Sequence, residues 1–83
     1  MANKITINDC ENKLDEAISI VRNNVDVVKQ GKLFEECILF LKVAVVELTR
    51  LKKYFDVKQA KQFITALDNM IADVATYGVK ASA

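Results

Sequence analysis

The sequence predicts an all-α fold, an antiparallel three-helix bundle in which the chain runs up, down and up. The chain has no proline, and its two glycines, Gly31 and Gly78, each stand where a run of apolar residues at helical spacing stops, as glycine does at helix C-caps. Apolar residues recur three and four positions apart along most of the chain, which is typical of amphipathic helices. The segments between these signals are so short that consecutive helices have to pack as antiparallel neighbours.

The first helix is predicted over residues 7–30. Thr6, followed three residues later by Asp9, resembles a capping box with aspartate in place of glutamate, and Asn8 with Glu11 is an equally good alternative start. The expected core face consists of Ile7, Cys10, Leu14, Ala17, Ile18, Val21, Val25 and Val28.

The third helix is predicted over residues 57–77. Asp56 can accept a hydrogen bond from the backbone of Gln59, whose side chain can reach back to complete a capping box. Gly78 is expected to end the helix, and residues 78–83 to form a frayed tail. Its expected core face consists of Val57, Ala60, Ile64, Leu67, Ile71 and Val74, widened by Phe63, Met70 and Tyr77.

The middle helix is predicted over residues 32–54 and includes the strongly apolar stretch from Cys37 to Leu48. Valine, isoleucine and phenylalanine favour strands, but the stretch lacks the alternation of a half-buried strand, so we predict a helix. On a helical wheel its apolar residues divide into two stripes. The expected core stripe is Leu33, Phe34, Cys37, Leu41, Ala44, Leu48, Leu51 and Phe55, with Ile38, Phe40 and Val45 beside it.

The other stripe, which we call the second stripe, consists of Leu39, Val43 and Val46 and is divided from the core stripe by Glu36 and Glu47. A lone three-helix bundle has no use for it. Scattered surface aliphatics are one explanation, because isolated exposed apolar residues are normal. Clustered ones usually mark contact sites, which favours a protein–protein surface.

Ile20 and Val27 point away from the core face of the first helix in the same way. Antiparallel pairing about Gly31 would set Ile20 level with Val43. The off-core residues of the first and second helices would then form one exposed patch, or the third helix would cover one of these two groups. The predicted interface is Ile20, Val27, Leu39, Val43 and Val46. Burying ~800 Å² per subunit would stabilise a marginal fold of this size, which favours a homodimer.

Basic residues gather around the corner between the second and third helices, beside Tyr54 and Phe55. Such a combination can bind phosphates and stack bases. However, cations at a helix C-terminus also favour the helix dipole, and the acidic start of the first helix lies at the same end and could neutralise them. The candidate phosphate-binding residues are Arg50, Lys52, Lys53, Lys58 and Lys61.

Composition excludes several classes of protein. The formal net charge of +1 suggests neither a polyanion binder nor an acidic mimic of nucleic acid. With no histidine and only Cys10 and Cys37, we predict no zinc site and no cofactor, and we expect both thiols to be reduced and buried in the core. No signal peptide or bilayer-spanning run is recognised, so the expected location is the cytoplasm.

No nucleophile motif, phosphate loop or metal signature is present in the sequence. We therefore predict a single helical domain, residues 1–83, that is not an enzyme but a protein–protein interaction module, a homodimer that binds and modulates or inhibits another protein. One alternative is a nucleic-acid-binding helical dimer that uses the basic corner from Arg50 to Lys61. Another is a structural subunit of a larger helical assembly.

Overall fold

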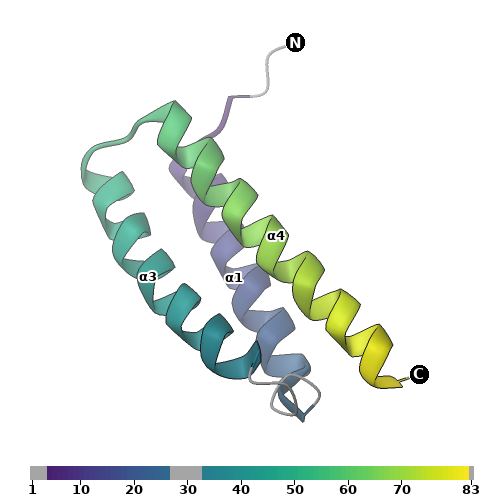
Figure 1. Cartoon of the computed structure of the whole chain (residues 1–83). Helices are drawn as coiled ribbons and strands as arrows, with labels where there is room; N and C mark the ends of the chain where they lie inside the picture. Colours follow the sequence, from purple (N-terminus) through teal and green to yellow (C-terminus); the bar gives the residue numbers. More distant parts are fainter. Residues whose placement is uncertain (1–3, 27–32, 83) are drawn as a thin grey trace.

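The computed structural model describes residues 4–26 and 33–82, and the side chains of residues 4–26 and 35–76. The described residues form three packed helices, labelled as in Figure 1: α1 (Ile7–Asn23), α3 (Leu33–Lys53) and α4 (Val57–Ser82). The prediction of an all-α fold of three packed helices is therefore confirmed. Consecutive helices run in opposite directions along the bundle (Figure 1).

The start of α1 is fixed by a reciprocal pair of hydrogen bonds. The backbone N–H of Thr6 donates to Oδ2 of Asp9 at 2.8 Å, and the backbone N–H of Asp9 donates to Oγ1 of Thr6 at 3.3 Å. This is the predicted capping box with aspartate in the place of glutamate. The alternative start at Asn8 is not used, because Asn8 already lies inside the helix.

α1 ends at Asn23 rather than at Gln30, and Val25 and Asp26 are helical again after the turn at Asn24, so the predicted helix is interrupted there. The side-chain Nδ2 of Asn24 donates to the carbonyl of Ile20 at 2.8 Å, and its backbone N–H donates to Val21, only three residues back, at 3.2 Å. Asparagine competes in this way with the regular helical ladder, which explains the break. Residues 27–30 and the predicted cap at Gly31 lie outside the described residues.

The start of α4 agrees with the prediction, but its end does not. Oδ1 of Asp56 accepts from the backbone N–H groups of Lys58 at 2.9 Å and of Gln59 at 3.4 Å. The Gln59 side chain does not reach back as predicted, since its Oε1 accepts instead from Arg50. The helix continues through Gly78 to Ser82, because an interior glycine costs only about 1 kcal/mol relative to alanine and no proline follows.

The core lies along the line where the three helices meet. All of the buried residues that the structure describes are apolar, and they occupy the predicted faces: Cys10, Leu14, Ala17 and Val21 from α1; Cys37, Leu41, Ala44, Leu48 and Leu51 from α3; Ala60, Phe63, Leu67, Met70 and Val74 from α4.

Three residues predicted to face the core are exposed instead: Val45 (49 %), Phe55 (44 %) and Val57 (51 %). Phe55 lies beyond the last residue of α3, Lys53, so the helical spacing that placed it on the core stripe no longer applies. Val57 is the first residue of α4 and lies at the end of the bundle.

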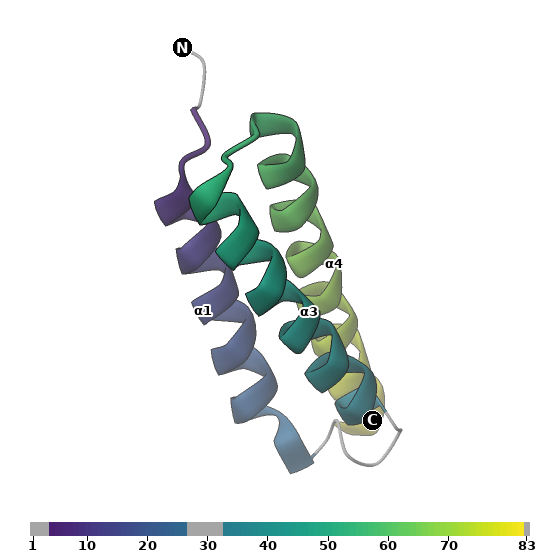
Figure 2. The ribbon, with the colours of Figure 1, turned by 90° about the vertical axis from the view of Figure 1, so that its left-hand side faces the viewer.

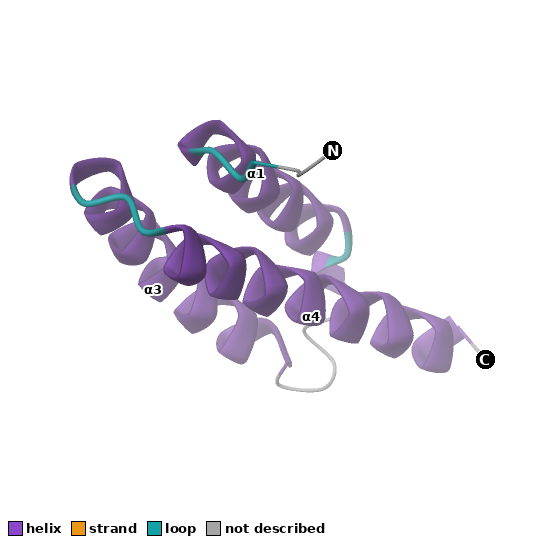
Figure 3. Cartoon of the chain, turned by 90° about the horizontal axis from the view of Figure 1, so that it is seen from above, coloured by secondary structure: helices purple, strands orange, loops and turns teal. Residues whose placement is uncertain are grey.

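The three helices do not pack equally. α1 makes most of its contacts with α4 and then with α3, while α3 and α4 contact each other least. α3 and α4 diverge from their short connection at residues 54–56 (Figure 1), and seen from the side, α3 lies in front with α1 and α4 to either side of it (Figure 2). Seen from above, α1 lies on one side of the α3–α4 pair (Figure 3). The opposite side of that pair is therefore left open by the described residues.

A candidate protein-interaction groove

The open side of the α3–α4 pair is hollowed into a groove. Two adjoining pockets form it, of about 410 Å³ nearer the connection at residues 54–56 and about 290 Å³ farther from it, and they share Phe40 and Ala66. The floor of the groove is apolar and consists of Phe40, Ala44, Phe63, Ala66, Leu67 and Met70. We call this feature the α3–α4 groove.

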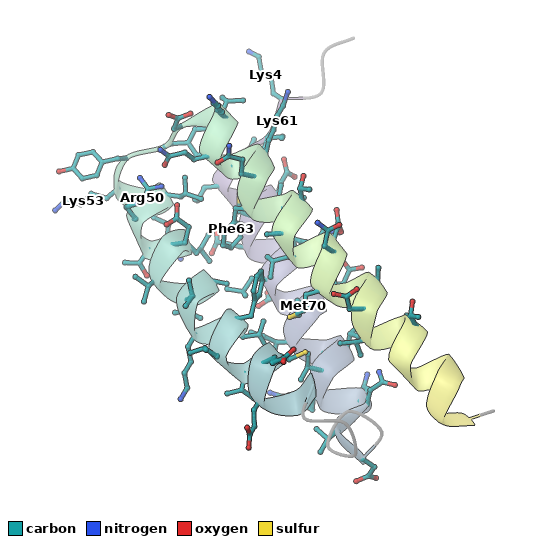
Figure 4. The ribbon with its side chains drawn as sticks, viewed as in Figure 1. Lys4, Arg50, Lys53, Lys61, Phe63 and Met70 are labelled. Atoms are coloured by element: carbon teal, nitrogen blue, oxygen red, sulfur yellow. The ribbon has the colours of Figure 1, made fainter. Side chains whose placement is uncertain are left out.

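Side-chain size explains why the groove is there. Phe63 and Met70 lie between α4 and α3 (Figure 4), and each is only 7 % exposed. These large side chains stand between the two helices, whereas Ala44 and Ala66 are too small to fill the space beside them. The result is a hollow with an apolar floor, which is the usual form of a site that receives an apolar group.

The second stripe lies beside this groove and is strongly exposed. Leu39 is 65 %, Val43 is 61 % and Val46 is 70 % exposed, and Val43 also lines the groove. Val43 therefore joins the second stripe to the groove, while Leu39 lies beside Glu35, Ile38 and Lys42. Clustered exposed apolar side chains of this kind usually mark a contact site.

Ile20 does not belong to that surface. It is half-buried and packs against the core, on the same face of α1 as Lys13, whose Nζ lies 2.7 Å from Oδ1 of Asp68 on α4. No described residue of α1 lines either pocket of the groove, so Ile20 lies apart from Val43. Of the predicted interface residues, Leu39, Val43 and Val46 come together, Ile20 lies apart from them, and Val27 is outside the described residues.

One end of the α3–α4 groove is closed by polar contacts. Arg50 forms an ion pair with Glu47 on its own helix and donates a hydrogen bond to Oε1 of Gln59 on α4. The hydrogen bond from Arg50 lowers the pKa of the Glu47 carboxyl below its ordinary value. Arg50 thus links α3 to α4 at the end nearest their connection.

The other end of the groove is acidic. Glu36 from α3 and Asp73 from α4 line it together with Asn69 and Cys37, and none of the residues described there is a lysine or arginine. Burial raises the pKa of the Cys37 thiol, and the nearby charges of Glu36 and Asp73 raise it further. Neither carboxylate forms an ion pair with a described side chain. The groove therefore carries negative charge at one end and the Glu47–Arg50 ion pair at the other.

Two of the basic residues of the corner form ion pairs within the chain. Arg50 is paired with Glu47, and Nζ of Lys52 lies 3.2 Å from Oε2 of Glu11 at the acidic start of α1. In Figure 4, Lys53 projects to the left and Lys61 projects upward, near Lys4, and Nζ of Lys53 lies 5.6 Å from the centre of the Tyr54 ring. Two of the five candidate phosphate-binding residues, Arg50 and Lys52, are therefore paired with carboxylates of the chain.

Sequence reasoning missed a second exposed apolar cluster, which we call the apolar corner: Tyr54 (65 % exposed), Phe55 (44 %) and Val57 (51 %). Phe55 and Val57 are two of the residues predicted to face the core. The signal that could have revealed the cluster is the N-cap at Asp56, because it leaves no helical turn to carry Phe55 toward the core.

Both cysteines are free and buried, as predicted. Burial is the main cause that raises the pKa of each thiol, and the charges of Asp9 and Glu11 raise that of Cys10 further. A protonated, buried thiol is a poor nucleophile and a poor metal ligand. Within the described part of the chain, no three acidic, cysteine or histidine side chains come close enough together to hold a metal ion.

The helices of residues 4–26 and 33–82 do not have the character of membrane spans, since none combines the length and the apolar composition that crossing a bilayer requires. Searches against family models, curated proteins and solved structures found no match to this chain. Its function therefore has to be argued from the groove, the second stripe and the apolar corner.

Proposed function

We propose that this protein is a non-enzymatic protein–protein interaction module, a homodimer that binds another protein and modulates or inhibits it. The observation that supports this most is the exposure of Leu39, Val43 and Val46 beside the apolar floor of the α3–α4 groove. A hollow beside a stripe of exposed aliphatic side chains suits a second helix better than it suits a small polar substrate.

Burial of the apolar surface favours a second copy of the chain as the partner, because a second copy is always present. A stable interface buries ~800 Å² per subunit, and at about 25 cal/mol per Å² the apolar part of that area contributes several kcal/mol. The chain has 83 residues, close to the size at which a single core is marginal. Association would therefore stabilise the fold as well as cover the apolar surface.

The apolar corner is the surface that we assign to the other protein. Tyr54 lies eleven residues beyond Val43, directly after the last residue of α3, which is about 16 Å along the helix axis. A dimer contact centred on the second stripe would leave the corner accessible. Exposed aromatic side chains are enriched at protein interfaces, which supports this assignment.

Light-scattering chromatography tests the homodimer. The wild-type chain is expected to elute with the mass of a dimer at micromolar concentration, and Val43→Glu is expected to elute as a monomer because a buried carboxylate would be unpaired. Thr49→Glu is the matched control, since Thr49 is exposed on the polar side of α3. A monomeric wild-type protein would refute the proposal.

Binding to the other protein is tested by affinity capture from the native host. We expect Phe55→Ser and Tyr54→Ser together to lose a partner that the wild-type dimer retains, and Val45→Ser to keep it. Equal capture by all three proteins would show that the apolar corner is not the binding surface.

Nucleic-acid binding has less support, because Arg50 and Lys52 are paired within the chain and the labelled lysines point in different directions. A gel-shift assay with DNA and RNA at low salt tests it. Binding that weakens steeply with salt, and that Lys58→Ala with Lys61→Ala abolishes, would favour this alternative. A mass that keeps growing with concentration would instead favour a subunit of a larger helical assembly.

A further inference from the structure

We infer that a second copy of the chain occupies the α3–α4 groove, with its α3 lying antiparallel to the first α3 about a two-fold axis near Val43. This inference rests on the proposed homodimer and specifies its geometry. It is carried by two features of α3: the spacing of the residues beside the groove and the unequal charge of the two helix ends.

The spacing is that of an interhelical seam. From Glu36 onward, residues at steps of three and four lie on one side of α3, apart from its core face: Glu36, Leu39, Val43, Val46, Arg50 and Lys53. A strict alternation of three and four is the pattern by which one helix packs along another. The middle of the seam is apolar and its two ends are charged.

The charges at the two ends have opposite signs. The first turn of α3 carries Glu35 and Glu36, and the last turn carries Arg50, Lys52 and Lys53. Glu36 and Arg50 each lie seven residues from Val43, so an antiparallel pair centred on Val43 sets each Glu36 beside Arg50 of the partner subunit. A parallel pair would set like charges side by side, which is unfavourable.

The groove itself fits this arrangement. Its acidic end, formed by Glu36 and Asp73, would receive the basic end of the incoming α3. Arg50 can keep its contact with Glu47 and still reach a carboxylate of the second copy, because a guanidinium has five N–H donors. The α3 and α4 helices of both copies would then form a four-helix layer with each α1 outside it.

Cysteine cross-linking tests this geometry. Val43→Cys places two thiols at the axis, and it is expected to form a disulfide-linked dimer under mild oxidation. In Leu39→Cys the two thiols lie eight residue positions apart along the antiparallel pair, about 12 Å, beyond the ~7 Å between Cα atoms that a disulfide spans. Leu39→Cys is therefore expected to stay uncross-linked, and so is the wild type, whose cysteines are buried. Efficient cross-linking of Leu39→Cys would show a parallel pair and overturn the inference.

Charge reversal tests the pairing of the ends. We expect Glu36→Lys and Arg50→Glu each to weaken the dimer roughly tenfold, because each places like charges side by side across the axis. The double variant is expected to recover most of the loss, because the two reversed charges would again attract each other between the subunits. Asp15→Lys on α1 is the control for the change in net charge, and circular dichroism verifies that each variant is folded.

The outcomes separate this inference from the proposed function. If Val43→Glu splits the dimer but Glu36→Lys behaves like Asp15→Lys, the homodimer stands and the antiparallel charge pairing is wrong. If the wild type is monomeric, both fail, and the groove is then free to receive a helix of a different protein.

Discussion

Arg50 joins two helices at the end of the groove nearest their connection. In sequence it is one basic residue among five around a corner, and in the fold it is held by Glu47 and Gln59. Its nearest neighbours decide its role, because a guanidinium paired with a carboxylate attracts phosphate less than a free one does. At the scale of single residues, the local partner therefore matters more than the residue type.

The Glu47–Arg50 contact makes the stability of the fold depend on pH in the acidic range. The pKa of Glu47 is lowered from its ordinary value of 4.5 by the hydrogen bond from Arg50. A lowered pKa adds stability that is present above pH 4.5 and is lost as the pH falls through the folded value. We expect Glu47→Gln to lose less stability than the wild type between pH 5 and about pH 3, by a small margin because both side chains are largely solvated.

Urea unfolding at the two pH values measures this difference. Asp15→Asn serves as a control for the removal of an exposed carboxylate that forms no ion pair with a described side chain. A wild type and a Glu47→Gln variant that lose stability equally on acidification would contradict the prediction.

The helices begin and end where local chemistry dictates, and this can be tested at α1. Thr6→Ala removes the side chain that accepts from the backbone of Asp9, and it is expected to lower the free energy of unfolding by about 1 kcal/mol. Asn8→Ala is the matched control, because Asn8 was the alternative cap and lies inside the helix. Chemical denaturation should show a clearly larger loss for Thr6→Ala than for Asn8→Ala.

Gly78 distinguishes two descriptions of the end of α4. Inside a helix, Gly78→Ala is expected to raise the stability of the protein by about 0.5–1 kcal/mol, because alanine is the better helix former. At a left-handed C-cap, the position that the sequence suggested, the same change would lower it. Thermal unfolding followed by circular dichroism distinguishes the two: a higher Tm for Gly78→Ala indicates a helix interior, and a lower Tm indicates a left-handed C-cap.

At the scale of the whole molecule, folding and association are expected to be linked. If the dimer forms as proposed, a hundredfold rise in protein concentration should raise the Tm by roughly 5–8 °C, since mass action favours the associated state. The Tm of Val43→Glu should not depend on concentration. A concentration-independent Tm for the wild type would indicate that the chain folds as a monomer.

Much of the fold could be predicted from the sequence, and the candidate site only in part. The capping box of α1, the start of α4 and the apolar faces of all three helices follow from interactions between residues a few positions apart. The second stripe was recognised because Leu39, Val43 and Val46 do not fit the periodicity of the core face. The break at Asn24 and the continuation of α4 through Gly78 were not predicted. The end of a helix depends on small differences between competing hydrogen bonds and propensities, which the sequence pattern does not resolve.

The sequence by itself determined that this is an all-α chain, where its helices begin, which of their faces are buried and that α3 carries a second apolar stripe. Only the tertiary structure decided that α3 and α4 diverge, that a groove opens between them beside that stripe, that Ile20 packs against the core apart from the groove, and that Arg50 and Lys52 of the basic corner are paired within the chain. The physical reason is the range of the forces involved. Helical periodicity and capping act within one or two turns, whereas a groove depends on how Phe40, Phe63 and Met70 fill the space between helices that are distant in sequence.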